Sequence, residues 1–137
     1  MNDKARPIVG IILTAMCALL VVGILTFAGP CAVSGAASVE PCHGASRAAL
    51  GAGVVALILS IVRIFERDEG ERRGLDLGIT LVGALVAVLP GVLIDLCAAQ
   101  TARCHAVMQP FCLGVGIVLA LVAAGDLVKR LLSLRKK

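Results

Sequence analysis

The chain has 137 residues, of which 59% are hydrophobic and 16% charged, and its mean hydropathy is +1.01. A soluble domain of this length needs more polar surface than this composition supplies, so we expect an integral membrane protein in a lipid bilayer. With three Phe, no Trp and no Tyr, the chain offers no aromatic platform for stacking bases, and we expect no nucleic-acid partner.

Four apolar runs follow one another along the chain, and each is long enough, or nearly so, to cross a bilayer core. They predict membrane helices at residues 7–28, 45–65, 77–94 and 107–127. The second run is short, and we expect Arg47 and Arg63 at its two ends to snorkel to opposite interfaces. The predicted fold class is an all-α, integral membrane four-helix bundle.

The three connections between these runs differ in charge. Residues 29–46 are rich in Gly, Pro, Ser and Ala and predict a loop, and residues 95–103 predict a second, short loop. Residues 66–76, reading ERDEGERRGLD, are too polar for the bilayer and predict a hydrophilic turn. Within the third run, Pro90-Gly91 predicts a kink, because proline frees a backbone carbonyl.

The basic residues divide unequally between the two sides of the predicted bundle. All Lys and Arg except Arg47 and Arg103 fall in the N-terminal stub, near the charged turn or in the basic tail 129–137. The positive-inside rule therefore predicts cytoplasmic N and C termini. The other two loops then lie outside, where disulfides can persist.

The two halves of the chain resemble each other. We interpret the chain as one membrane domain, with repeat one at 7–65, a cytoplasmic turn at 66–76, repeat two at 77–128 and then the tail. Three spacings support a tandem duplication. Gly10 and Gly23 precede Gly78 and Gly91 by 68 residues, Cys42-His43 precedes Cys104-His105 by 62, and Gly51 and Gly53 precede Gly114 and Gly116 by 63.

Glycine in a membrane helix lets neighbouring backbones approach closely, and van der Waals contact is the main attraction between helices in lipid. We therefore predict helix-packing positions at Gly51, Gly53, Gly114 and Gly116.

Four cysteines lie in or beside the two predicted outer loops: Cys31, Cys42, Cys97 and Cys104. One disulfide per loop would tie adjacent helix ends together and stabilise the fold by about 2–3 kcal/mol. Four cysteines also allow two pairings between the loops, and both stay open.

Two chemical alternatives use the same segments. A membrane thiol-disulfide oxidoreductase would need a reactive outer pair, for which Arg47 and Arg103 could lower a thiol pKa, yet no C-x-x-C occurs. A metal or haem site could draw on four further residues: His43, His105, Met108 and Cys112. Methionine and cysteine side chains in an apolar helix usually pack against neighbouring apolar side chains, so no cofactor is expected.

Two acids stand beside the apolar runs, Asp95 on the outer side and Asp126 near the inner end of the fourth helix. Because both lie at helix ends, we expect interfacial solvation of their carboxylates rather than a transport role.

The run from Cys42 to Gly53 resembles the signature of an uncharacterised bacterial and archaeal family of small four-helix membrane proteins, a domain of unknown function. The first matching positions are Cys42, His43, Ala48, Gly51 and Gly53, and the second half adds Cys97, Cys104, His105 and Pro110. The chain departs from the family pattern at Gly44, Ala45 and Ala49, where an aromatic, a threonine and an acid are usual. The resemblance implies no established reaction. It implies a location in a bacterial or archaeal cell membrane and an accessory role beside ABC-type export permeases.

Taken together, the sequence favours a small, non-enzymatic multi-pass membrane subunit with disulfide-stapled outer loops. Its expected partner is a larger membrane protein or a second copy of itself. The oxidoreductase and the metal or haem protein remain as alternatives.

Overall fold

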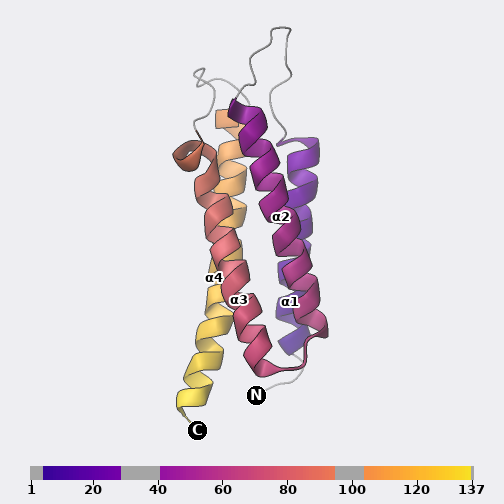
Figure 1. Ribbon diagram of the computed structural model, residues 1–137, viewed down its shortest axis with the longest axis vertical. Helices are drawn as coiled ribbons and strands as arrows, with labels where there is room; N and C mark the ends of the chain where they lie inside the picture. The colour runs from indigo at the N-terminus through magenta and orange to yellow at the C-terminus, as the bar shows by residue number, and fades with distance from the viewer. Residues whose placement is uncertain (1–4, 29–40, 95–103, 137) are drawn as a thin grey trace, which may run out of the picture.

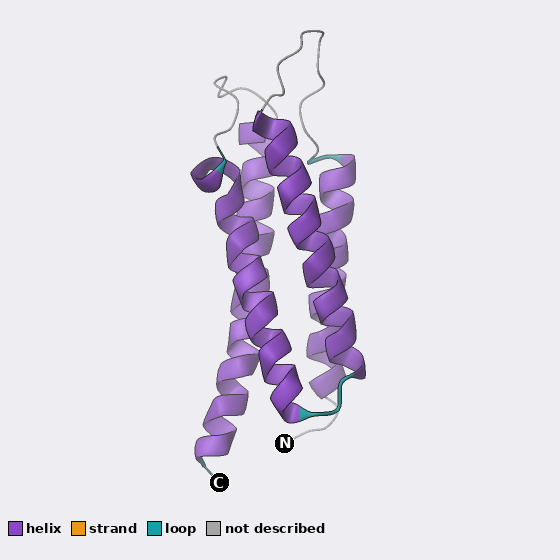
Figure 2. Cartoon of the chain, in the orientation of Figure 1, coloured by secondary structure: helices purple, strands orange, loops and turns teal. Residues whose placement is uncertain are grey.

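The computed structural model describes residues 5–28, 41–94 and 104–136. Within them the chain forms four α-helices and two short π-helical turns, and no strand. In chain order they are α1 (Ala5–Thr26), α2 (Pro41–Phe65), α3 (Glu69–Val88), η1 (Leu89–Leu93), η2 (Cys104–Met108) and α4 (Gln109–Arg135). The helices stand side by side as a bundle with both chain ends at one end of it (Figure 1), and helix dominates the described chain (Figure 2). The predicted all-α four-helix fold is confirmed.

All four helices are long and apolar enough to cross a membrane. The candidate spans are Pro7–Thr26, Gly44–Phe65, Glu69–Leu93 and Ala106–Arg135, with mean hydropathies between 2.0 and 2.9. Many large apolar side chains point outward, Leu25 at 67% exposure and Leu121 at 66% among them. Such a surface suits lipid rather than water, so the chain fits a multi-pass membrane protein.

The charged segment 66–76 is mostly helix, which corrects the predicted turn. Only residues 66–68 connect α2 to α3. Asp68 is the N-cap of α3, and its Oδ1 accepts a hydrogen bond from the Gly70 N–H at 2.7 Å. Glu69 and Glu71 lie in the first turn, where carboxylates interact favourably with the helix dipole. The polar residues therefore start the helix rather than interrupt it.

Two other helices are also longer than predicted. α2 begins at Pro41, so residues 41–46 belong to the helix and not to the predicted loop 29–46. Proline suits a first helical position because its missing N–H would be unpaired there in any case. α4 continues to Arg135, so most of the predicted basic tail 129–137 is helical.

The predicted kink at Pro90-Gly91 is confirmed. Gly91 has φ 94°, a left-handed conformation that glycine adopts without a Cβ penalty. The turn η1 is closed by backbone bonds at 3.1 Å, from the Ile94 N–H to the Leu89 carbonyl and from the Gly91 N–H to the Ile94 carbonyl. α3 therefore stops near this point.

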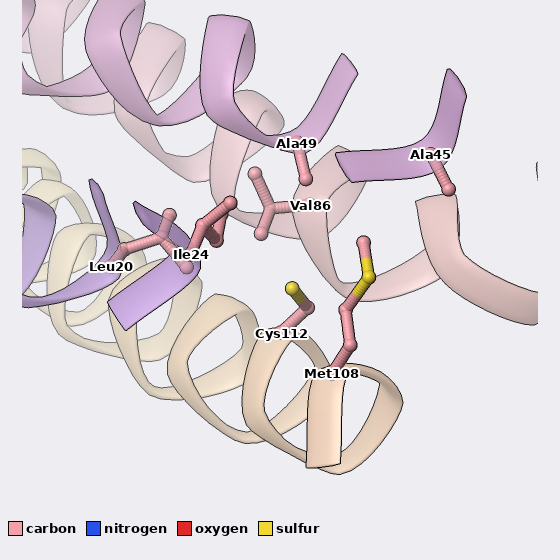
Figure 3. Close-up of a cluster of buried hydrophobic side chains, with 7 residues drawn as sticks. All are labelled: Leu20, Ile24, Ala45, Ala49, Val86, Met108 and Cys112. Carbon is pink, nitrogen blue, oxygen red and sulfur yellow. The ribbon is translucent and has the colours of Figure 1, made fainter. Parts of the chain in front are cut away.

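The apolar interior has two layers along the bundle axis. The layer nearer the chain ends contains Leu13, Cys17, Ala56, Ile79, Leu119 and Ala123. The layer nearer the other end contains Leu20, Ile24, Ala45, Ala49, Val86, Met108 and Cys112 (Figure 3). Each layer takes side chains from all four helices, and Val82 packs against both layers.

The two halves bury equivalent helix faces. At an offset of 63, buried positions of α2 coincide with buried positions of η2 and α4: Ala45 with Met108, Ala49 with Cys112, Gly53 with Gly116, Ala56 with Leu119 and Ser60 with Ala123. For α1 and α3 the offset that matches burial is 66: Gly10 with Asp76, Leu13 with Ile79, Cys17 with Gly83 and Leu20 with Val86. The offset of 68 expected from the glycine spacing pairs buried residues of α1 with mostly exposed residues of α3. It therefore does not align the buried faces of these two helices.

Candidate functional site

Arg63, close to the end of α2, is a buried charge with 2% of its side chain exposed. Its Nε donates a hydrogen bond to Asp76 Oδ1 on α3, and its Nη2 donates to Asp126 Oδ2 on α4. Asp76 is fully buried and Asp126 is 17% exposed. Arg63 was expected to snorkel to an interface and Asp126 to be solvated there. Both expectations are wrong, because the two residues neutralise each other inside the bundle.

A second arginine completes the cluster from α4. Arg130 Nε lies 2.9 Å from Asp126 Oδ2 and 3.6 Å from Asp76 Oδ2, and its Nη1 lies 2.7 Å from Glu69 Oε2 at the start of α3. Two arginines therefore face two buried aspartates, with Glu69 at the rim. We call Arg63, Asp76, Asp126, Arg130 and Glu69 the buried ion network.

Helix α1 makes room for the buried ion network at Gly10. A Cβ added to Gly10 on α1 would lie 3.2 Å from Arg63 Nη1 and 3.0 Å from Ile64 Cγ1. Both separations are tight, so glycine here lets the guanidinium lie against the α1 backbone. The network thus joins α2, α3 and α4 and rests on α1.

Equivalent positions of the two repeats meet in the network. Arg63 on α2 and Asp126 on α4 are 63 residues apart, which is the offset that matches the buried faces of these helices. Gly10 on α1 and Asp76 on α3 are 66 apart, the offset of the other pair. The first half therefore supplies the Arg63 cation and the small residue Gly10, and the second half supplies the two carboxylates at the matching positions.

Charge balance explains why this arrangement is tolerated. A single unpaired charge in a bilayer is costly, whereas arginines and carboxylates that face one another offset much of the desolvation. Within the described residues, Asp76 Oδ2 has no hydrogen-bond donor, and Arg130 Nε lies 3.6 Å from it. The next layer of the bundle is apolar. The network is therefore suited to holding helices together at one end of the bundle.

The turn beside the network is ordered by a carboxylate. Glu66 Oε1 accepts hydrogen bonds from the Asp68 N–H at 3.2 Å and from the Arg67 N–H at 2.9 Å. The hydrogen bond from the Asp68 N–H lowers the pKa of Glu66, and hydrogen bonds with the Glu71 side chain and the Arg67 N–H act in the same direction. Arg72 Nε also donates to the Glu66 carbonyl at 2.6 Å, so the α2–α3 connection is closely tied.

The predicted cysteine and histidine sites fall mainly outside the described part. Cys31 and Cys97 lie outside the described residues. Cys42 and His43 lie in the first turn of α2, and Cys104 and His105 lie in η2, but the side chains of these four lie outside the description as well. Among the described side chains, Cys17 and Cys112 are buried free thiols.

Two of the predicted ligand residues lie in the apolar core. Met108 and Cys112 are fully buried and point into the layer formed with Leu20, Ile24 and Val86 (Figure 3). In the described part of the chain, no group of three or more His, Cys, Asp or Glu side chains could hold a metal ion. The observed surroundings of the two sulfur atoms are those of packing residues.

The four predicted packing glycines separate into two kinds. A Cβ on Gly116 would lie 2.7 Å from Ala87 N and from Gly83 O, both backbone atoms of α3. A Cβ on Gly53 would lie 3.2 Å from side-chain atoms of Leu20 and Val21 on α1. Gly51 and Gly114 are exposed, with nothing of the described chain within 4 Å of a Cβ.

Sequence reasoning missed Asp76 and Arg130, and it placed Arg63 wrongly. One signal was available, because adding the offset of 63 to Arg63 gives Asp126, so opposite charges stand at matching positions of the two halves. A second was the four-residue spacing of Asp126 and Arg130, which puts both on one helix face. Asp76 carried no such signal, because it stood at the edge of a segment interpreted as a turn.

Comparisons with known proteins identify a family for the chain but do not identify a function. Neither a curated protein nor a solved structure matches the chain. The model of one family, described as a domain of unknown function (DUF4418), matches residues 11–129 and so takes in all four helices. The chain therefore belongs to this family of unknown function.

Proposed function

We propose that the chain is a non-enzymatic accessory subunit that packs against a larger membrane protein through the outward faces of α2 and α4. The observation that carries the proposal is the placement of Gly51 and Gly114. They occupy equivalent positions of the two repeats, both are exposed, and a side chain at either would meet nothing of the described chain. The partner class we favour is an ABC-type export permease, which the family resemblance implies.

A glycine inside a helix costs about 1 kcal/mol relative to alanine, and a close contact with another helix can offset that cost. Gly116 has that contact within the chain, against α3. Gly51 and Gly114 have none among the described residues, so we assign the contact to a helix of another protein, where small residues permit close approach.

The buried ion network supports a scaffolding role. Its four inner groups pair with one another, which fixes the relative positions of α2, α3 and α4. A rigid bundle presents its outer faces in a constant arrangement, and this lowers the entropy lost on binding a partner.

The test is co-purification from native membranes after mild solubilisation. Gly51→Leu and Gly114→Leu should each reduce the amount of a co-purifying membrane protein, because a bulky side chain would separate the helix surfaces. Gly74→Leu is the matched control, since Gly74 is also exposed with open space around it but lies on α3. A chain that purifies alone, or a complex equally sensitive to Gly74→Leu, would contradict the proposal. A complex containing only a second copy would replace the larger partner with self-association.

The proposed topology keeps both termini and the 66–68 connection in the cytoplasm, with Cys31–Cys42 and Cys97–Cys104 disulfides outside. Its support is the distribution of basic residues along the sequence. Alkylation of intact cells with a membrane-impermeant thiol reagent should modify the four cysteines only after reduction. Modification without a reductant would argue against the disulfides.

A further inference from the structure

We propose that the basic end of the bundle binds the phosphate group of an anionic phospholipid at Arg73 on α3. This inference goes beyond the accessory role, because it concerns lipid rather than a protein partner. It rests on one arginine Nε that has no hydrogen-bond partner among the described residues, on the position of that arginine, and on the apolar surface next to it.

Arg73 differs from Arg63, Arg72 and Arg130 at this end of the bundle. Arg63 and Arg130 pair with acids, and Arg72 donates to a backbone carbonyl. The Nε of Arg73 is buried and has no hydrogen-bond partner among the described residues, and no described acid pairs with the side chain. A buried donor without an acceptor costs free energy, and a phosphate oxygen would remove that cost through a charge-assisted bond.

The position of Arg73 brings it to the junction of α3 and α4. Residues 73, 76, 80, 83 and 87 follow the alternating three- and four-residue spacing of one helix face. Two members of this face are in close contact with α4: Gly83 faces Ala120, and Ala87 faces Gly116. The same face continues through Asp76 to Arg73, one turn from the Glu69–Arg130 ion pair.

The outward side of α3 offers the apolar surface that a lipid chain needs. Leu77 and Leu81 follow Arg73 by four and eight residues, so they lie one and two turns from it toward the middle of the bundle. Their side chains are 49% and 62% exposed. An acyl chain on these leucines would run along the apolar span and leave its phosphate beside Arg73 near the end of that span.

A membrane lipid is the source of phosphate that fits this surface. The exposed leucines continue the lipid-facing side of an apolar helix, whereas a soluble phosphate would gain nothing from them. The cations match an anionic headgroup and not a zwitterionic one, whose ammonium group would face them.

The experiment measures lipid binding to the purified full chain in detergent by native mass spectrometry. Phosphatidylglycerol should bind and phosphatidylcholine should not, and excess inorganic phosphate should leave the bound lipid in place. Arg73→Gln should weaken phosphatidylglycerol binding about tenfold, the loss of one charge-assisted bond. Arg73→Lys should bind with intermediate affinity, since it keeps the charge but not the fork of donors.

Arg47→Gln is the matched control, because Arg47 is exposed at the opposite end of the bundle. It should bind phosphatidylglycerol as the unchanged chain does. Equal losses in Arg73→Gln and Arg47→Gln, equal binding of the two lipids, or displacement by inorganic phosphate would each overturn the proposal. Helical circular dichroism of each variant separates lost binding from lost folding. Because no partner protein is present, this result is independent of the accessory role.

Discussion

At the scale of single residues, the buried ion network is the feature whose loss should matter most. Asp76 is completely buried between two arginines, Asp126 is 17% exposed, and Glu69 is 42% exposed. The cost of removing a charge from such a cluster depends on burial, because the partner that remains is an uncompensated charge in a medium that solvates it poorly.

We expect the free energy of unfolding to fall in the order of burial. Asp76→Asn should cost about 3–5 kcal/mol, the range for breaking a buried pair, and Asp126→Asn should cost less. Glu69→Gln should cost less than about 1 kcal/mol, as exposed ion pairs do. Unfolding in detergent by titration with a denaturing surfactant gives these values. Equal losses for Asp76→Asn and Glu69→Gln would show that the inner pairs add nothing beyond a surface contact.

Replacing the whole inner set separates a structural role from a chemical one. A variant with Arg63→Met, Asp76→Leu, Asp126→Leu and Arg130→Met removes all four charges together, and such replacements are often neutral or stabilising. If that variant folds and still binds its partner, the network serves to hold the helices in place. If it folds and loses the partner, the charges themselves take part in the interaction.

At the scale of helices, the α3–α4 contact is the closest in the bundle. Gly116 faces backbone atoms of α3, and Gly83 faces backbone atoms of α4. Backbone cannot move aside as a flexible side chain can, so any added volume must separate the two helices. Gly114, two residues earlier, is exposed and has open space instead.

The two glycines should therefore respond in opposite directions to the same change. Gly116→Ala should destabilise the bundle by about 1–3 kcal/mol, as overpacking a well-packed contact does. Gly114→Ala should leave the isolated chain unchanged or stabilise it by up to about 1 kcal/mol, because alanine favours helix. Thermal unfolding of both variants in one detergent checks this. Similar destabilisation by both would mean that helical position alone sets the effect.

Helix number and approximate positions could be predicted from the sequence, whereas some boundaries could not. The apolar runs are long enough to identify each span by composition, so the four helices and the Pro90-Gly91 break follow directly. Charge misled the interpretation of 66–76, although Asp68 followed by Glu69 and Glu71 is a helix-start pattern. The pairing of Arg63 with Asp76 depends on how α2 and α3 are rotated about their axes, which periodicity in nearly uniform apolar runs does not fix.

At the scale of the whole molecule, the two halves are joined by charge as well as by apolar contacts. The most extensive helix contacts lie within each half, between α3 and α4 and between α1 and α2, and α2 with α3 and α1 with α4 supply the remainder. Arg63 is the one member of the buried ion network that comes from the first half, while Asp76, Asp126, Arg130 and Glu69 come from the second. Association of the halves should therefore depend on this single side chain.

Dividing the chain in the 66–68 connection tests that dependence. Fragments 1–67 and 68–137, produced together in one membrane, should assemble, because each keeps its own helix pair and the cut removes only a short connection. Arg63→Met should abolish assembly of the fragments while the undivided chain with the same change still folds, since the covalent link raises the effective concentration of the halves to the millimolar range. Arg47→Met, at the far end of α2 and exposed, should assemble normally. Co-purification through a tag on one fragment measures the outcome. Fragments that associate equally well with and without Arg63 would show that the apolar layers join the halves and that the network only sets their register.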